Sequence, residues 1–274
     1  MCRGEPVSEQ PNCVPADVDT EIPSFARIYD YLLGGGHNFD ADRQIAEQFK
    51  QALPGAPAIA QLNRAFLHRA VLFMMEQGIR QFLDIGSGIL TMGNVHEIAQ
   101  RIDPAARVVY VDREPVAVNH SQLMLGANDN ATAIQRDLRD PDGIMDHPQV
   151  RDLLDFDQPL GLLLVGVLHF IAPEGHPSGL LASYREWLAP GSFLAMSHFT
   201  ADSRPAEMAA MVEVMKKSAD PICPRSRAEF MSLFKGFELV EPGVVPTADW
   251  RPQWPYDMDG PEREQIYAGV ARKV

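Results

Sequence analysis

The stretch that decides the fold is Gln81-Phe-Leu-Asp-Ile-Gly-Ser-Gly-Ile-Leu-Thr-Met-Gly93. Its apolar beginning is typical of a β-strand, and Gly86 and Gly88 end that strand in a turn. The apolar residues between Val95 and Ile102 then recur at spacings of three and four, which indicates a helix. Glycine suits such a turn because a side chain would block the tight backbone path and the close approach of a ligand. The stretch predicts a strand, a turn and a helix, with a candidate nucleotide site at the turn.

Two carboxylates favour a ligand at this turn. Asp84 lies inside the apolar strand, where an unpaired charge would cost several kcal/mol, so we expect it to hold the amides of the turn or a ligand. A second strand, predicted at residues 107–112, ends in Asp112, which lies 24 residues beyond Gly88. A Rossmann-type unit places a carboxylate on ribose hydroxyls at roughly this interval. A strand that merely ends in glycines stays an alternative, because a Gly-x-Gly pair alone is not specific.

Composition bounds the class of protein. The chain has 274 residues, of which 46% are hydrophobic, enough for one large globular domain with or without an appendage. A net charge of −13 disfavours nucleic acid as a partner, because binding the phosphate backbone needs clustered Lys and Arg. The three cysteines are odd in number and lack Cys-x-x-Cys spacing, so we expect free thiols and neither a disulfide framework nor a metal site.

The location of the protein is inferred from its apolar runs. The longest of them, residues 160–172, has 13 residues, fewer than the roughly 18–20 that span a bilayer. Residues 1–22 contain several prolines and almost no periodic apolar residues, so we expect a disordered leader without a signal sequence. We therefore expect a cytoplasmic protein with no membrane association.

Periodicity predicts the remaining elements. Before the turn we expect a helix capped by Ser24, with Arg27 on its polar face, a helix capped by Asp40, and a long helix from Pro57 to Gly78. These form an expected N-terminal helical cap, residues 23–78, ahead of a main domain, residues 79–274. After the turn, apolar runs alternate with helical periodicity, which is typical of a parallel sheet covered on both faces. The predicted strands are 131–135, 160–167, 192–199, 237–241 and 265–273; the predicted helices are 115–125, 141–154, 177–188, 204–218 and one that starts at a capping box, Ser226 to Glu229.

The order of these motifs resembles a class I S-adenosylmethionine-dependent methyltransferase, and most closely the actinobacterial S-adenosyl methyltransferase family first catalogued as a domain of unknown function. The resemblance covers nearly the whole chain after residue 22, and the following segments carry it: Ala26-Arg-Ile-Tyr-Asp-Tyr-Leu-Leu-Gly-Gly-Gly-His-Asn-Phe39, Asp42-Arg43, Phe82-Leu-Asp-Ile-Gly-Ser-Gly88, Gly93-Asn-Val-His96, Val109-Tyr-Val-Asp112, Asp137-Leu-Arg-Asp-Pro141, Leu163-Leu-Val-Gly-Val-Leu-His-Phe170, Ser197-His-Phe-Thr200 and Trp250-Arg-Pro252.

The resemblance implies a fold and an activity. The expected fold is a Rossmann-like α/β sandwich with a seven-stranded, mostly parallel sheet, helices on both faces, an antiparallel last strand and the N-terminal helical cap. The expected function is methyl transfer from S-adenosylmethionine to a small-molecule acceptor, without a metal. The chain departs from the family at Leu90, where Pro is usual, and at His37, where Lys or another polar residue is common. The acceptor, the atom that is methylated and the oligomeric state stay open at this stage.

Two other functions share these features. A nicotinamide-dependent dehydrogenase has the same strand, turn and ribose acid, but its fingerprint needs a third glycine at position 91, where this chain has Thr91. A cofactor-binding protein that has lost catalysis and acts as a regulator has the same sequence signature as an active enzyme. Binding of NAD would identify the first, and binding without transfer would identify the second.

Each residue of the expected cofactor site also has a plain structural interpretation. Asp112 would accept hydrogen bonds from the ribose or cap the helix that starts at Pro115. Asp137 would lie at the adenine edge, with Leu138 packed on the ring, or would be a turn residue. Further expected contacts are the backbone amides of Gly86, Ser87 and Gly88, the side chain of Asn94 near the amino-acid end, and the pocket wall formed by Val165 and Gly166.

The catalytic candidates are two histidines at neighbouring strand ends, His169 and His198. We expect Leu168, His169 and Phe170 at the mouth of the pocket, where His169 is the preferred general base and His198 orients a loop. Both could instead be structural histidines. From the resemblance, Tyr29, Asp30, Tyr31 and Asn38 belong to a segment that folds over the cofactor; the alternative is ordinary helix surface. Glycines 34–36 would supply the hinge of this segment.

Overall fold

The computed structural model of the protein describes residues 18–91, 93–252 and 260–274. The expected leader therefore lies mostly outside the described residues. Of its last five residues, Val18 packs against a small apolar cluster that contains Ile89 and Val116.

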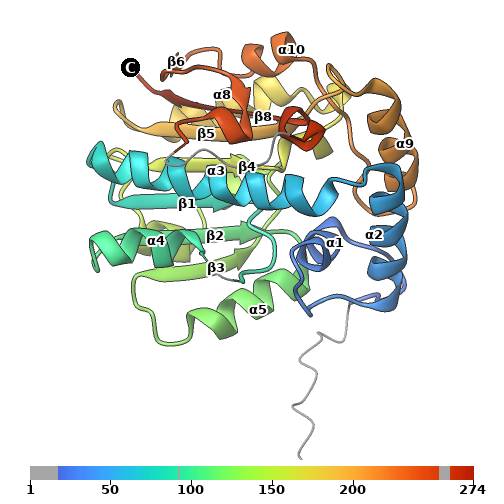
Figure 1. Ribbon diagram of the computed structural model, residues 1–274. Helices are drawn as coiled ribbons and strands as arrows, with labels where there is room; N and C mark the ends of the chain where they lie inside the picture. Colours follow the sequence, from blue (N-terminus) through green and yellow to red (C-terminus); the bar gives the residue numbers. More distant parts are fainter. Residues whose placement is uncertain (1–17, 92, 253–259) are drawn as a thin grey trace, which may run out of the picture.

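A single mixed sheet forms the centre of the molecule (Figure 1). Its continuous strand order is β3-β2-β1-β4-β5-β8-β6, and the short β7 pairs with β8 beside this path. The five strands from β3 to β5 are parallel, whereas β8 runs antiparallel to β5, β6 and β7. The bounds are β1 Gln81–Ile85, β2 Arg107–Asp112, β3 Ala131–Gln135, β4 Gly161–Val165, β5 Phe193–Phe199, β6 Glu238–Leu239, β7 Val245–Pro246 and β8 Ile266–Arg272. The expected sandwich with an antiparallel last strand is confirmed.

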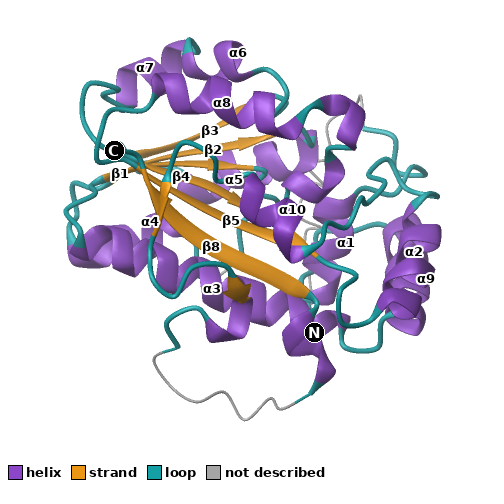
Figure 2. Cartoon of the chain, turned by 90° about the horizontal axis from the view of Figure 1, so that it is seen from above, coloured by secondary structure: helices purple, strands orange, loops and turns teal. Residues whose placement is uncertain are grey.

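Helices cover both faces of the sheet (Figure 2). One face is packed by α3, α4 and the end of α5, whose side chains share a core with Phe82, Val108 and Leu163. The other is packed by α6, α7, α8 and α10, around Leu83, Val109 and Leu162. The strands are buried on both faces and are therefore apolar throughout rather than alternating. The bounds are α3 Ala56–Glu76, α4 Val95–Ile102, α5 Pro115–Leu125, α6 Pro141–Met145, α7 Pro148–Leu153, α8 Pro177–Trp187 and α10 Arg227–Ser232.

A separate helical layer stands at the carboxyl ends of the parallel strands. It consists of α1 (Phe25–Leu32), α2 (Asp40–Ala52) and α9 (Pro205–Met215), which lie together at the right-hand end of Figure 1. Their apolar side chains form one cluster that includes Phe25, Phe49 and Met211. The N-terminal half of α3 joins this cluster and its C-terminal half packs on the sheet, so one helix connects the layer to the sheet.

The register of the strands brings the residues of the candidate ligand site to one edge of the sheet. Leu83 of β1 pairs with Val109 of β2 and with Leu162 of β4, so these three strands end at the same edge. The glycine turn follows β1, Gly166 follows β4, and Asp112 is the last residue of β2. They therefore meet at that edge, facing the helical layer. Ligands of open α/β sheets bind at such a point.

Two local predictions were wrong, and a third was right only in part. The helix expected at 141–154 is two helices, because Pro148 has no N–H to donate and biases His147 away from helical geometry. Asp40 does not cap α2: the N-cap is Phe39, and its N–H donates to the carboxylate of Asp42 at 2.8 Å. Ser24 occupies the N-cap of α1 but its side chain makes no cap bond. The capping box at Ser226 is confirmed.

None of the helices in the described part of the chain combines the length and apolarity needed to cross a bilayer.

Candidate functional site

The glycine turn is fixed to the neighbouring strand by its backbone. The N–H groups of Gly86 and Ser87 donate to the carbonyl of Val111 at 2.8 and 3.2 Å. Gly86 has a φ of +72°, and a Cβ there would lie 2.3 Å from Cγ2 of Val167, so both conformation and space require glycine. Gly88 has a φ of +65° with open space beside it. The turn thus presents bare backbone to the edge of the sheet.

Asp112 holds the last amide of the turn. Its Oδ2 accepts the N–H of Gly88 at 2.8 Å, and its Oδ1 accepts the N–H of Glu114 at 2.9 Å. Burial raises the pKa of the Asp112 carboxyl, and the two backbone N–H donors oppose part of that rise. Glu114, not Asp112, is the N-cap of α5. Asp112 is therefore oriented by two backbone bonds, and each oxygen keeps a lone pair for a ligand.

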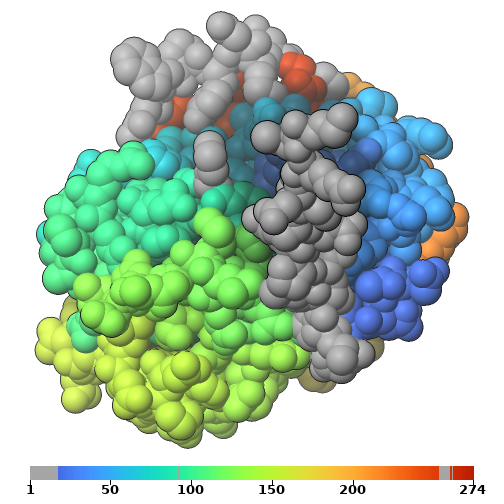
Figure 3. All heavy atoms as spheres, turned by 90° about the horizontal axis from the view of Figure 1, so that it is seen from below, coloured from blue at the N-terminus to red at the C-terminus, as the bar shows by residue number. Residues whose placement is uncertain are grey.

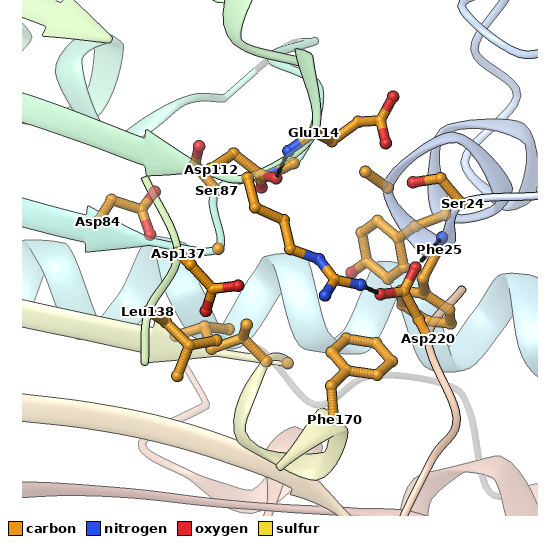
Figure 4. A pocket seen from close by; sticks show the side chains of 18 of the residues that line it. Ser24, Phe25, Asp84, Ser87, Asp112, Glu114, Asp137, Leu138, Phe170 and Asp220 are labelled. Carbon is orange, nitrogen blue, oxygen red and sulfur yellow. Dashed lines mark hydrogen bonds and ion pairs between the residues drawn. The ribbon is translucent and has the colours of Figure 1, made fainter. Parts of the chain in front are cut away.

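Asp84 does not hold the turn, because the amides of Gly86, Ser87 and Gly88 have the partners just described. Its side chain faces the pocket instead, and Figure 4 shows it across from Asp137. Burial raises the pKa of the Asp84 carboxyl to about 7, against the influence of the nearby Arg64 guanidinium. A buried acid poised near neutrality beside a turn of bare backbone marks a ligand site.

These groups line one pocket of about 330 Å³. Of the residues expected from sequence to bind a cofactor, nine lie in its lining: Asp84, Gly86, Ser87, Gly88, Asp112, Asp137, Leu138, Val165 and Gly166. Opposite them the wall is formed by Ser24, by Phe25 and Tyr29 of α1, and by residues 219–221. Figure 3 shows the N-terminal helices (blue) and the middle of the chain (green) from below. An ion pair between Arg27 of α1 and Glu114, at the start of α5, connects these two parts of the chain.

Asp137 and Leu138 follow β3 on the far side of the pocket. Asp137 is paired with Arg139, which keeps the pKa of its carboxyl below the usual range. The backbone carbonyl of Leu138 accepts the hydroxyl of Tyr184 at 2.6 Å, so the segment is anchored to α8. Asp137 therefore lies in the pocket wall and is ionised at neutral pH.

Three expected cofactor residues lie elsewhere. Tyr31 points away from the pocket and donates its hydroxyl to Glu47 at 2.8 Å. Asn38 is buried, and its amide donates to Asp30 Oδ2 at 2.9 Å. Asn94 is the N-cap residue of α4, where its side chain accepts the N–H of Thr91 at 3.2 Å. In each case the polar group serves the local fold, and none of the three lines the pocket.

The two histidines come together, but not at the mouth of the pocket. Their ring centroids are 5.6 Å apart, and both side chains are buried. The 3-10 helical turn Leu168–Phe170 directs His169 inward. Of the three residues of this turn, Phe170 lines the pocket. Both ring nitrogens of His198 are engaged, Nδ1 with the carbonyl of Phe199 at 2.8 Å and Nε2 with Arg225 at 2.7 Å. Burial lowers the pKa of His198 to about 3. His198 is therefore a neutral structural residue.

Other pocket residues were not expected from the sequence. Asn63 of α3 accepts the Ser197 hydroxyl at 2.6 Å and donates to the Tyr29 hydroxyl at 3.3 Å, which places an amide beside Gly166. A Cβ at position 166 would lie 3.0 Å from Asn63 Nδ2. Arg113 pairs with Asp220 at the edge of the pocket. An Asn within an otherwise apolar helical periodicity was the available signal for Asn63.

A family model for S-adenosyl methyltransferases matches residues 11–274. The chain belongs to this S-adenosyl methyltransferase family. Its activity class is therefore methyl transfer, its cofactor is S-adenosylmethionine, and the dehydrogenase alternative is set aside. None of the curated proteins compared with the chain matches it.

Solved structures agree with the family. A candidate methyltransferase from Thermobifida fusca YX is 41% identical, with a TM-score of 0.90, over 96% of this chain and 99% of that one. A DUF574-family protein from Streptomyces avermitilis MA-4680 is 38% identical, also with a TM-score of 0.90, over 93% of this chain and 99% of that one. An O-methyltransferase family protein from Burkholderia thailandensis, 12% identical with a TM-score of 0.50 over 89% of this chain and 63% of that one, shares the fold alone.

Proposed function

We propose that this S-adenosyl methyltransferase transfers the methyl group to a small-molecule acceptor, and that the pocket at the glycine turn holds the cofactor. The observation that carries the proposal is the carboxylate of Asp112, fixed by the Gly88 amide at 2.8 Å beside a turn where a side chain at position 86 would not fit. That combination suits a ribose laid against bare backbone.

The remaining walls suit the other parts of the cofactor. Asp84 lies in β1, just before the turn, and lines the pocket, where its carboxylate would attract the positively charged amino-acid end. Asp137 and Leu138 follow β3, where a carboxylate and an apolar side chain would meet the edge and face of adenine. Val165, Gly166 and Asn63 lie between these two ends and would surround the reacting centre. The chain thus offers acids to the cationic and hydroxyl groups and apolar surface to the ring.

In methyl transfer the main contribution of the protein is to position the acceptor and the cofactor. When bound, S-adenosylmethionine supplies a methyl group activated by a positively charged sulfur. An acceptor aligned in line at contact distance recovers several kcal/mol of the barrier by positioning alone. A base is needed only if the acceptor is a hydroxyl or a protonated amine. His198 does not fill that role, because both its ring nitrogens are already hydrogen-bonded. No group of three or more potential metal ligands comes together within the described part of the chain.

Calorimetry with S-adenosylmethionine and S-adenosylhomocysteine tests the cofactor site. Asp112→Asn should weaken both by roughly 1.5–3 kcal/mol, because it removes charged hydrogen bonds to ribose. Asp103→Asn is the control and should leave affinity unchanged, because Asp103 follows α4 ahead of β2 and does not line the pocket. Equal affinity in the two variants would contradict the assignment of Asp112.

Transfer is tested with cofactor labelled in the methyl group and a metabolite extract. A labelled small molecule should form with the wild-type chain and not with Asp112→Asn at subsaturating cofactor. Tight cofactor binding without transfer, together with a stable protein partner in pull-downs, would instead support a regulatory protein.

A further inference from the structure

A second, smaller chamber lies directly behind the pocket. The two share Phe25, Tyr29, Asn63 and Gly166, which form the partition between them. Beyond this partition the chamber is enclosed by α2, α3 and β5, and its walls include Phe49, Phe199 and Ile59. Gly166 follows β4 and faces both spaces, so the partition stands where the methyl group of a cofactor in the pocket would come nearest to the chamber.

The chamber and the pocket differ in charge. None of the described residues that line the chamber carries a charge, whereas the pocket is lined by Asp84, Asp112, Asp137 and several arginines. A charged group moved into such apolar surroundings would lose its hydration without gaining a partner, at a cost of several kcal/mol. The chamber therefore suits an uncharged molecule, while the pocket suits the charged cofactor.

One polar side chain in the chamber lacks a partner. His169 is 1% exposed, and neither of its ring nitrogens is hydrogen-bonded to any residue that the structure describes. Phe25, Phe170 and Phe199 surround the ring, with centroids 6.1, 4.4 and 4.7 Å away. Burial lowers the pKa of His169 well below its usual value, and His198 and Arg225 lower it further, so the ring is neutral. A buried imidazole without partners costs about 1–3 kcal/mol, which a ligand would recover.

We infer that this chamber receives the methyl acceptor, and that the acceptor is an uncharged, mostly apolar, flat molecule whose hydroxyl group donates a hydrogen bond to His169. The inference rests on the proposed function and adds the class of acceptor to it. The aromatic walls favour a ring, and the single unpaired imidazole favours a single polar group.

The chamber is too small for an acceptor in the free chain. Its empty space is about 10 Å³, enough for about one water molecule. An acceptor therefore enters only when Phe25 and Tyr29 of α1 move aside, and the hydrogen bond from the Tyr29 hydroxyl to the carbonyl of Ala60, 3.0 Å long, must break or shift. This makes α1 the element that admits the acceptor.

The reaction at this place is balanced. As the acceptor oxygen forms its bond to the methyl carbon, the carbon–sulfur bond breaks and its electron pair stays on sulfur. The hydroxyl proton passes to the free ring nitrogen of His169; the lowered pKa of the ring opposes this step, and the loss of the positive charge on sulfur, which moves to the imidazole, drives it. The products are a methyl ether, S-adenosylhomocysteine and a protonated imidazole that releases its proton when the site opens.

The test uses the full-length chain saturated with S-adenosylhomocysteine and three probes of similar shape: phenol, toluene and benzoate. Affinity is measured by calorimetry at pH 7.5, and the ring nitrogens of His169 are followed by ¹⁵N NMR. Phenol should bind about tenfold more tightly than toluene, the amount that one net hydrogen bond supplies. It should also shift the ¹⁵N signals of His169, and benzoate should not bind.

Variants assign the effect to the imidazole. His169→Phe should abolish the preference for phenol over toluene, whereas His169→Gln, which keeps a hydrogen-bond acceptor, should retain part of it. His68→Phe is the control, because His68 lies on α3 outside the chamber lining. All three should bind S-adenosylhomocysteine like the wild type.

Three results would overturn the inference. Benzoate could bind as tightly as phenol, or the preference for phenol could survive in His169→Phe. The chain could also bind S-adenosylhomocysteine while no probe enters the chamber, which would make the chamber a water site. Failure of the chain to bind S-adenosylhomocysteine at all would instead contradict the proposed function.

Discussion

Asp220 connects Arg113 to the first helix: its carboxylate pairs with the guanidinium of Arg113 and also accepts the N–H of Phe25 at 2.8 Å (Figure 4). Arg113 stands between Asp112, which faces the pocket, and Glu114, which pairs with the buried Arg27 of α1 at 2.6 Å. Asp112, the last residue of β2, therefore lines the expected ribose site, and the two residues after it contact the segment after α9 and helix α1. Direct contacts of this segment therefore connect the carboxylate expected at the ribose with the helix that partitions the pocket from the chamber.

Arg113→Met should loosen α1 without unfolding the protein. The pair with Asp220 is partly exposed and is worth about 0.5–1 kcal/mol. Hydrogen exchange of residues 25–32 should be faster in the variant, and S-adenosylhomocysteine should slow it in the wild-type chain by closing α1 over the pocket.

Arg151→Met is a matched control for this exchange experiment. Its arginine is 44% exposed, against 42% for Arg113, and pairs with Asp146 between α6 and α7. Exchange of α1 should be unchanged in this control. The same exchange with and without ligand in the wild type would leave residues 24–39 as scaffold rather than a lid.

Asp42→Asn should strongly destabilise the helical layer. Asp42 is fully buried and accepts hydrogen bonds from Arg27 Nε at 2.8 Å, Ser24 N at 3.0 Å and Phe39 N at 2.8 Å. An amide cannot accept all three, and Arg27 would lose half of its charge compensation, so we expect a loss of about 2–4 kcal/mol in the free energy of unfolding.

Asp40→Asn provides the comparison for Asp42→Asn two residues away. Asp40 is exposed and pairs with Arg43. Urea unfolding of this variant should differ from the wild type by less than about 0.5 kcal/mol. Similar losses in the two variants would show that the buried network does not support the layer.

The sheet and the cofactor edge were predictable because they depend on backbone rules. Gly86 and Gly88 do adopt positive φ, and Asp112 does end the second strand beside them. Alternating apolar runs fixed the parallel strands, since strands buried on both faces leave a strong signal. The fold and the positions of nine expected pocket residues followed from these local patterns.

The remaining site residues depend on where side chains point, which spacing does not determine. Arg27 was expected on a polar helix face, yet it is 2% exposed because the buried Asp42 and the partly buried Glu114 pair with it from other elements. Asp220 lies 107 residues from Arg113, so no local pattern links them. His169 turns inward because the chain tightens into a 3-10 helical turn directly after β4.

Gly86→Ala should be more damaging than Gly88→Ala. Both positions have positive φ, which costs an L-residue about 1–2 kcal/mol. At position 86 the new Cβ would also lie 2.3 Å from a methyl of Val167, whereas at 88 it meets open space. Chemical denaturation should therefore show a loss about 1–3 kcal/mol larger for Gly86→Ala. Equal losses would mean that Val167 moves aside at no cost.

The stability of the free protein should depend on Asp84. Its pKa is about 7 in the folded chain, against an ordinary value of 3.8, so between these values the folded state binds more protons than the unfolded state. Stability therefore falls as pH rises from about 4 to 7, and the full penalty is present above pH 7. Asp84→Asn removes it, and should raise the free energy of unfolding at pH 8 by up to about 4 kcal/mol while changing little at pH 4. A destabilised variant at pH 8 would contradict this expectation.

Ionisation of Asp84 should strengthen cofactor binding as pH rises, whereas it lowers the stability of the free protein. A positively charged cofactor favours ionised Asp84, so wild-type affinity for S-adenosylmethionine should rise roughly five- to tenfold between pH 6 and 7.5, as the competent ionised fraction grows. This window ends below the ordinary pKa of an α-amino group, about 7.7–8.0, so the charge of the ligand stays nearly constant. Asp84→Asn should bind more weakly at pH 7.5 and show a flat profile across this range. Calorimetry at four pH values would measure both curves, and parallel curves for the two proteins would remove Asp84 from the cofactor site.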